Sequence, residues 1–332
     1  MNEKPHRGMD IPAANALVDN VDPSRPGLFQ LSPHYWVSNH ELLSPALATH
    51  VAACNPQRIQ YLAPARLRAA AHALAHPNFV LTGFGALALY GLPFLVEGCD
   101  ITFLADGFSR AQRASLLQPG VRRGSIPGPD VWLARCRGTR VQVASPALAT
   151  MQALKLVRRG TSRWPVVSAP GKDDAFTRAV QLIDATRRHL HVDPTKVLAA
   201  GQQHIDMLWL SSVIGASSGF ADSPKESEMR LIAQFLADKH GLLLEEQVTI
   251  WTEGRIVTTF DLVLIDMKRR LTVGLMYDGA HHWDKTQRNK DASINLEVTL
   301  QGWTPLRYSD ETLPQMYGQL DRLFQASGGA VQ

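Results

Sequence analysis

The stretch from Thr258 to Arg307 constrains the fold more than any other part of this chain. It begins with TTFDLVLI, an aliphatic and β-branched run, and a charged turn at 266–270 separates it from a second run, LTVGLMYDG. Two such runs joined by a short polar connection predict a β-hairpin. Apolar positions at 292, 296 and 300 then predict a helix that ends at Gly302, and a short strand should follow at 303–307.

Ionisable residues stand at the ends of these predicted strands. Asp261 lies inside the first apolar run, where a carboxylate is costly unless it is paired, hydrogen-bonded or placed on a metal. The second run ends at Asp278, and Gly279, His281 and His282 follow almost at once. The sequence therefore predicts acids and histidines gathered at one edge of a sheet.

An ordered set of motifs in the last third of the chain resembles a known family. The matching segments are Glu226 in SPKESEMRL, Asp261 in FDLVLI, YDGAHH, Asp291 in QRNKDA, and Gly302-Trp303 before Arg307. This order resembles the very-short-patch-repair-like branch of the PD-(D/E)XK endonuclease superfamily. The resemblance implies a restriction-endonuclease-like mixed sheet flanked by helices, which cuts DNA with a divalent metal held by strand carboxylates.

The chemistry of phosphodiester hydrolysis explains why such residues are needed. A water must become nucleophilic and a phosphate must be neutralised, and Mg²⁺ or Mn²⁺ can do both. Mg²⁺ takes hard oxygen ligands and commonly uses only one or two carboxylates. We therefore expect the roles to be divided as follows: Asp261 and Asp278 as metal ligands, Glu226 completing the acidic cluster or positioning a water, His281 or His282 as acid/base, and Lys290 contacting the scissile phosphate.

One position departs from the family pattern. Residues two apart on a strand share a face, so Gly274, Met276 and Asp278 should point the same way. Many relatives have a glutamate where this chain has Met276, and methionine is not a hard ligand. Two functions therefore stay open: a magnesium-dependent DNA endonuclease, which is a hydrolase, or a DNA-binding regulator that kept the nuclease fold and does not cut.

Structural roles compete with each of these assignments. Asp261 is equally typical of a buried acid bonded to backbone amides, and Asp278-Gly279 of a turn. Glu226 follows Ser223 by three residues with Pro224 between them, which is a capping-box arrangement. The histidines and Lys290 have ordinary surface roles as alternatives. No cysteine pair stands at ligand spacing, so zinc is not predicted.

Charge divides the chain into two halves. Up to residue 220 there are 22 Lys and Arg against 14 Asp and Glu, and from residue 221 there are 12 against 16. The basic excess peaks between 110 and 163, where Asp130 is the single acid. Besides Lys155, the basic residues there are Arg110, Arg113, Arg122, Arg123, Arg135, Arg137, Arg140, Arg158, Arg159 and Arg163. If they cluster in space they predict a nucleic-acid surface, for duplex DNA; if not, they are scattered surface arginines.

The length of 332 residues favours two domains. Residues 1–25 look like a flexible, proline-bearing lead-in with little to pack. A basic α+β region over 26–214 should follow, and the flexible stretch 214–219 should separate it from an α/β domain at 221–328. Helices are expected from Ser44-Pro45, over 58–74, from Ser145-Pro146 and from Pro194. The pieces within 28–51 and 58–74 could assemble a winged-helix DNA reader.

Two apolar segments of the front half carry a second resemblance. ALALYGLP and VASPALATMQAL, within residues 26–160, resemble antitoxin-like regulators of the AbiEi type. This resemblance implies DNA contact or a regulatory function for the front half.

The compartment is expected to be the cytoplasm. The three cysteines are far apart and suggest no disulfide framework, and the polar N-terminus lacks the apolar core of a signal peptide. Residues 79–96 carry no charge, but three glycines and a proline interrupt them. We interpret that stretch as a buried strand, turn and short helix, and not as a membrane span.

Overall fold

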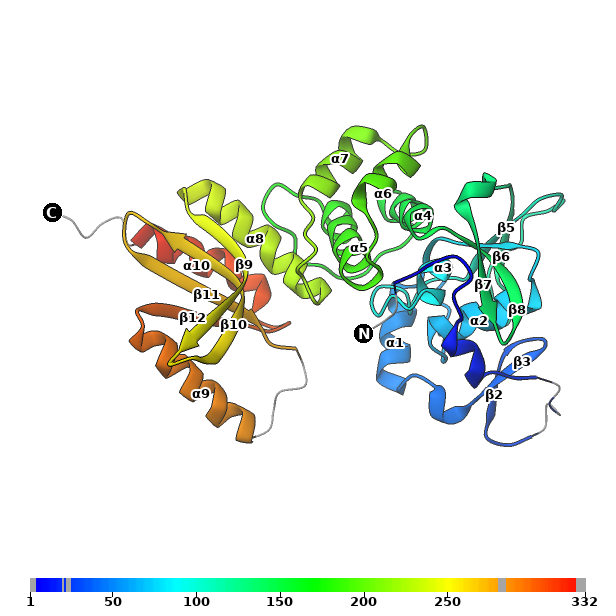
Figure 1. Ribbon diagram of the computed structural model, residues 1–332, viewed down its shortest axis with the longest axis horizontal. Helices are drawn as coiled ribbons and strands as arrows, with labels where there is room; N and C mark the ends of the chain where they lie inside the picture. The colour runs from blue at the N-terminus through cyan, green and yellow to red at the C-terminus, as the bar shows by residue number, and fades with distance from the viewer. Residues whose placement is uncertain (1–3, 20, 22–24, 280–284, 327–332) are drawn as a thin grey trace. The chain divides into compact units, whose positions relative to one another are not determined.

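The computed structural model describes residues 4–19, 21, 25–279 and 285–326, with backbone only for 285–292 and 326. The chain divides into two compact units (Figure 1). Unit 1 comprises residues 1–164 and 178–217, and unit 2 comprises 165–177 and 218–332. The described part of the chain is a mixed α/β protein with ten α-helices and three sheets. None of the helices described is long and apolar enough to cross a membrane.

Unit 1 is built on two sheets. A small antiparallel sheet has the order β1-β3-β2, with β1 at Val18–Asp19, β2 at Leu28–Ser32 and β3 at Tyr35–Ser38. A mixed sheet has the order β6-β5-β4-β8-β7. Its strands are β4 (Val80–Thr82), β5 (Thr102–Ala105), β6 (Gly120–Arg123), β7 (Val131–Cys136) and β8 (Thr139–Ala144). The strand and short helix expected within 79–96 are confirmed as β4 and α3.

Seven α-helices belong wholly or mainly to unit 1: α1 (Pro45–Cys54), α2 (Ala65–Ala75), α3 (Gly83–Leu89), α4 (Pro146–Arg158), α5 (Asp174–Leu190), α6 (Pro194–Gly201) and α7 (Met207–Gly215). The expected starts of α1, α4 and α6 are confirmed. In each, a side-chain oxygen accepts a backbone N–H of the first turn, from Ser44, Ser145 and Asp193. Proline at the first helical position adds to the signal because it has no N–H to satisfy.

Helix α2 is part of the core and not a DNA-reading helix. The expected helix over 58–74 begins only at Ala65, because Pro64 precedes it and Arg58 has a positive φ of 59°. Residues 67–73 of α2 are all buried. A recognition helix must expose side chains to a groove, so α2 cannot serve the winged-helix role expected of it.

The first described segment packs into unit 1, contrary to the loose lead-in expected for residues 1–25. Met9, Ile11 and Ala14 are buried, the last within a 3₁₀-helix, η1 (Pro12–Ala16). The backbone also bridges to β7 through Asp10 and Arg135. The prolines of this segment shape a short turn of helix, and that is compatible with burial.

Unit 2 is a four-stranded mixed sheet between helices. Its elements are α8 (Pro224–His240), β9 (Leu243–Thr252), β10 (Arg255–Asp266), β11 (Leu271–Tyr277), α9 (Lys285–Leu300), β12 (Trp303–Tyr308) and α10 (Met316–Ala326). The order is β12-β11-β10-β9, in which β10 is antiparallel to both neighbours and β12 is parallel to β11. The predicted hairpin, helix and third strand are confirmed. Figure 1 shows α9 on one face of the sheet and α8 with α10 on the other.

Three short 3₁₀-helices complete the described elements: η2 (Asn39–Glu41), η3 (Gly128–Asp130) and η4 (Leu313–Gln315).

The segment 165–177 belongs to unit 2. The backbone N–H of Val167 donates to Glu228, a fully buried carboxylate on α8, at 3.1 Å. Lys225 donates to the same carboxylate at 3.0 Å. A buried acid on α8 thus fixes a segment that lies about sixty residues earlier in the chain, and local composition gives no sign of this.

Candidate functional site

The end of β11 is organised by Asp261. The β10–β11 ladder runs from Asp266↔Leu271 to Leu262↔Leu275 and stops one residue before Asp261. There Oδ2 of Asp261 accepts the Tyr277 backbone N–H at 2.7 Å, so a carboxylate takes the place of a strand carbonyl. Asp261 therefore does have the structural role given above as the alternative, that of a buried acid bonded to a backbone amide. Its other oxygen, Oδ1, has no hydrogen bond to a described residue.

Glu226 closes the N-terminus of α8. Ser223 accepts the Glu226 N–H at 3.3 Å, and the Glu226 carboxylate accepts from the Ser223 hydroxyl and from the Asp222 N–H, both at 2.9 Å. This is the capping arrangement that the sequence indicates. The same carboxylate also faces Asp261 closely enough for the two charges to interact. A structural role and a place in the acidic cluster thus coexist in one side chain.

The acids of this region, which we call the acidic cluster (Asp222, Glu226, Asp261 and Asp278), repel one another. Burial, followed by the charge of Asp261, raises the pKa of Glu226 to about 7. Burial raises the pKa of Asp261 to about 6, against the hydrogen bond from Tyr277, and the charges of Asp222 and Asp278 add to the increase. Carboxylates with raised pKa values in contact with like charges are typical of functional sites.

Asp278 is paired with Arg307. The Asp278 N–H donates to the Tyr308 carbonyl at 2.8 Å, and Oδ1 accepts from the Arg307 guanidinium at 2.8 Å. The Asp278 side chain keeps 35% of its surface exposed. Arg307 partly neutralises the cluster and lowers the pKa of Asp261. Sequence reasoning assigned no role to Arg307 or to Asp222. Only folding brings these two residues near Asp261.

Met276 lies in the apolar core and not in the acidic cluster. It is 7% exposed and packs with Phe260, Val263 and Val298. Beside it, a Cβ at Gly274 would lie 2.5 Å from the Phe260 ring. Gly274, Met276 and Asp278 were expected to share one face that holds a metal. Gly274 and Met276 do share a face, but that face packs in the apolar core. Asp278 lies beyond the strand end at Tyr277, where its own pairings orient it.

The donor types in the cluster fit a hard divalent cation, since Asp261 and Asp278 each keep one carboxylate oxygen without a described partner. Among the described residues there is no group of three or more His, Cys, Asp or Glu side chains arranged to hold a metal. The predicted acid/base residues His281 and His282 lie outside the described residues. For Lys290 only the backbone is described, in α9. These three assignments stay predictions.

The arginines predicted to form one surface fall into three groups. The first is at the β6 edge of the mixed sheet, where Arg122 and Arg123 are exposed. Arg110 and Arg113 lie just before it, in a loop that bridges to β6 through Gln112. None of these four arginines has an ion pair or hydrogen bond with a described residue. We call this group the β6-edge arginines.

The second group lies at the opposite edge. Arg135 pairs with Asp10 at 2.9 Å and Arg137 with Asp19 at 3.3 Å, while Arg140 stands opposite Arg135 on β8. Four strand spacings separate β6 from β7 in the sheet order, which is roughly 19 Å. Sequence clustering therefore does not become one patch in space, and two arginines of this group are already neutralised.

The third group follows α4. Arg158 lies 3.9 Å from Asp206 and stacks over Trp209 at 4.8 Å, while Arg159 caps the helix end. Arg163 folds back onto a backbone carbonyl three residues earlier. Of the ten predicted arginines, the β6-edge arginines are the compact group left open to a phosphate.

Comparison with known proteins identifies no relative of this chain. A scan of protein-family models, a search of curated proteins and a search of solved structures each found no match.

Proposed function

We propose that this protein binds DNA and that unit 2 hydrolyses phosphodiester bonds with a divalent metal, Mg²⁺ or Mn²⁺. The observation that carries this proposal is the burial of Asp261 and Glu226 beside other acids: burial first, and the charges of neighbouring acids in addition, raise the pKa of Asp261 to about 6 and of Glu226 to about 7. Partly buried acids that repel one another are stabilised by a bound cation. The motif resemblance to PD-(D/E)XK endonucleases supports the same assignment.

Each residue has a distinct task in this proposal. Asp261 and Asp278 would hold the metal, which supplies an activated water and neutralises the phosphate. Glu226, with a pKa of about 7, is suited to accept or return a proton near neutral pH. Arg307 holds Asp278 in place through its 2.8 Å bond. His281, His282 and Lys290 remain candidates for acid/base and phosphate contacts.

The decisive variant is Asp261→Asn. Asparagine keeps an oxygen that can accept the Tyr277 N–H, so the strand end should persist while a charged ligand is removed. We expect Mn²⁺ binding, measured by calorimetry, to weaken at least tenfold and plasmid nicking to stop. Asp238→Asn, on the exposed side of α8, should change neither. Unchanged metal binding in Asp261→Asn would exclude this residue as a ligand.

DNA binding is tested through the β6-edge arginines. Replacing Arg110, Arg113, Arg122 and Arg123 with glutamine should weaken duplex binding and flatten its dependence on salt, by about 0.9 in the log–log slope for each phosphate that is no longer neutralised. Replacing the already paired Arg135 and Arg137 should have little effect on the slope. Equal effects from both sets would contradict the assignment.

A second candidate function is a DNA-binding regulator that does not cut. Two observations favour it: Arg307 already supplies a positive charge to Asp278, and Met276 lies in the core at the position where the PD-(D/E)XK pattern that the chain resembles has a glutamate. Salt-sensitive DNA binding with no nicking in Mg²⁺ or Mn²⁺, on any substrate tested, would select this function over the first.

A further inference from the structure

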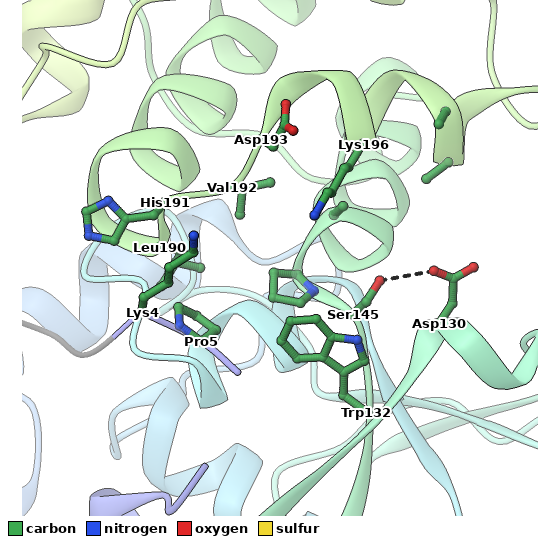
Figure 2. A pocket seen from close by; sticks show the side chains of 14 residues that line it. Lys4, Pro5, Asp130, Trp132, Ser145, Leu190, His191, Val192, Asp193 and Lys196 are labelled. Atoms are coloured by element: carbon green, nitrogen blue, oxygen red, sulfur yellow. Dashed lines mark hydrogen bonds between the residues drawn. The ribbon is translucent and has the colours of Figure 1, made fainter. Parts of the chain in front are cut away.

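Unit 1 contains a cavity of about 580 Å³, and none of the residues that line it belongs to the acidic cluster (Figure 2). This volume lies within the range of small-molecule sites, roughly 300–1,000 Å³. The cavity forms where the starts of β7 and α4 meet the segment 190–196, which leads into α6, and residues 4 and 5 form a further wall. All of these residues belong to unit 1.

Trp132 provides a rigid aromatic surface in this cavity. Its indole contacts the Tyr90 ring edge-on, with centroids 6.3 Å apart and an interplanar angle of 76°. Tyr90 is fixed in turn, because its hydroxyl donates to the Ala144 carbonyl at 2.9 Å. Pro146 and Leu190 extend the apolar lining. A planar ring entering the cavity would therefore meet an indole that does not need to be ordered first.

Two lysines reach into the same space. Lys4 and Lys196 come from distant parts of the sequence and approach from opposite sides, with Trp132 below them (Figure 2). Neither has an ion pair or hydrogen bond with a described residue. Both lie near enough to Asp193 for their charges to help lower its pKa, after the hydrogen bonds from Thr195.

The acids that line the cavity are already engaged. Asp193 accepts from the Thr195 N–H at 2.9 Å and from its hydroxyl at 2.7 Å, as the cap of α6. Asp130 accepts from the Ser145 hydroxyl at 3.3 Å, which Figure 2 marks. The two lysines are therefore the charges in this cavity without an ion pair or hydrogen bond among the described residues.

We propose that this cavity binds a nucleotide, with its phosphate between Lys4 and Lys196 and its base against Trp132. Asp130 retains acceptor capacity for a ribose hydroxyl or an amino group of the base. The chemistry follows from the side chains, since lysine neutralises a phosphate and an indole stacks on any base. The site lies in unit 1 and needs no metal, so it stands independently of the proposed nuclease activity.

A nucleotide can arrive free or as part of a single strand. A base paired in duplex DNA cannot reach the indole without leaving its stack, at a cost of a few kcal/mol. We therefore expect free nucleoside monophosphates or unpaired nucleotides to be the ligands. Calorimetric titrations of the full chain with AMP, GMP, CMP and UMP test whether a free nucleotide binds. A four-nucleotide single strand tests whether an unpaired strand binds.

The expected result is saturable binding of at least one of these probes, with adenosine and inorganic phosphate each at least tenfold weaker than AMP. Tighter binding of the oligonucleotide than of any monophosphate would identify an unpaired strand as the source. The absence of saturable binding by every probe at millimolar concentration would overturn the proposal. So would phosphate binding as well as AMP, because the indole would then have no role.

Five variants separate the two contacts from general damage to the fold. Lys4→Met and Lys196→Met should each weaken binding about tenfold, while Lys268→Met, an exposed lysine of unit 2, should not. Trp132→Leu should weaken binding more than Trp132→Phe, which keeps a ring for both Tyr90 and the base. Nucleotide affinity that is equal in all of these variants and in the unaltered protein would also overturn the proposal.

Discussion

The two units bury ionisable groups in opposite ways. In unit 1, Arg68 is 3% exposed and donates to the carbonyls of Ala63, Glu97 and Cys99 at 2.6–3.1 Å, so its charge is satisfied by the fold. In unit 2, Glu226 and Asp261 face each other and their pKa values rise to about 7 and 6.

This difference distinguishes a buried group that supports the fold, such as Arg68, from the acids of the candidate site. The Arg68 guanidinium is bonded to backbone carbonyls through all three of its nitrogens and is buried away from solvent, so it serves the framework. Carboxylates whose pKa is raised by burial and by neighbouring acids keep unused affinity for a cation. The same test applies to the cavity of unit 1, where the acids are engaged and the lysines are not. A charged side chain without hydrogen-bond or ion-pair partners in the protein indicates a place for a ligand better than the charge alone does.

The largest effect is expected from Met276→Glu. If Met276 belonged to the acidic cluster, glutamate would restore a ligand, but its burial among apolar side chains means that a charge there costs about 5 kcal/mol of stability. Chemical denaturation should show unit 2 unfolded or severely destabilised. Met267→Glu, in a turn and 70% exposed, should be nearly neutral. A stable Met276→Glu protein with tighter Mn²⁺ binding would restore the ligand interpretation.

Arg68→Met should destabilise unit 1 by about 4 kcal/mol. It leaves one buried and two partly buried carbonyls without their donor, and a buried carbonyl left unsatisfied costs roughly 1–3 kcal/mol. It also removes the stacking of the guanidinium over Tyr61, at 3.7 Å. Arg66→Met, on the exposed face of the same helix, is the control. Equal midpoints for the two variants in urea would contradict a framework role for Arg68.

Gly274→Ala should destabilise unit 2 by roughly 2–3 kcal/mol, since overpacking a core commonly costs 1–3 kcal/mol. The added methyl would lie 2.5–2.6 Å from the Phe260 ring, which cannot retreat because it stacks on Trp303 at 5.6 Å. Gly318→Ala in α10 meets nothing within 4 Å and should be neutral or stabilising. Denaturation followed by tryptophan fluorescence measures both; a neutral Gly274→Ala would show that the ring can move.

The smallest effect is a pH response with opposite sign in the two units. Burial lowers the pKa of His72 in unit 1 to about 3. Between pH 7 and 5 the unfolded chain therefore gains a proton that the folded unit does not, and unit 1 should become less stable by about 2 kcal/mol. Thermal unfolding of the unaltered protein, compared with His72→Leu, measures this decrease. His50→Leu, at an exposed position of α1, should keep it.

Unit 2 should respond the other way. Because the pKa values of Glu226 and Asp261 are raised, the folded unit binds protons at a pH where the unfolded chain has released them. Its stability should therefore increase as pH falls from about 8 to 5. Asp261→Asn should reduce that increase, and a response of the same sign in both units would contradict the comparison.

Patterns of short range were predictable from the sequence. Alternating apolar runs around a charged turn give the β10–β11 hairpin, and Ser-Pro or Asp-Pro pairs start α1, α4 and α6. The capping box at Ser223 and Glu226 was equally readable. Each depends on interactions within a few residues, either side-chain caps on nearby backbone N–H groups or the geometry of a short turn.

Contacts between residues distant in sequence decided what local composition did not indicate. Residues 9–14, within the lead-in expected to be flexible, are buried, and their contacts include β7, more than a hundred residues away. Residues 165–177 belong to unit 2, where Val167 bonds to Glu228 on α8. The arginines clustered in sequence but not in space, because the strand order places β6 and β7 at opposite edges of one sheet.

The sequence by itself determined the local elements of this protein and the identity of Asp261 and Glu226 as unusual acids. Only the tertiary structure decided which distant groups come together: Arg307 reaches Asp278 and Met276 faces the core in unit 2, while Lys4, Lys196 and Trp132 line one cavity in unit 1. Local geometry is set by neighbours along the chain, whereas charge satisfaction depends on which distant groups packing brings within a few ångströms.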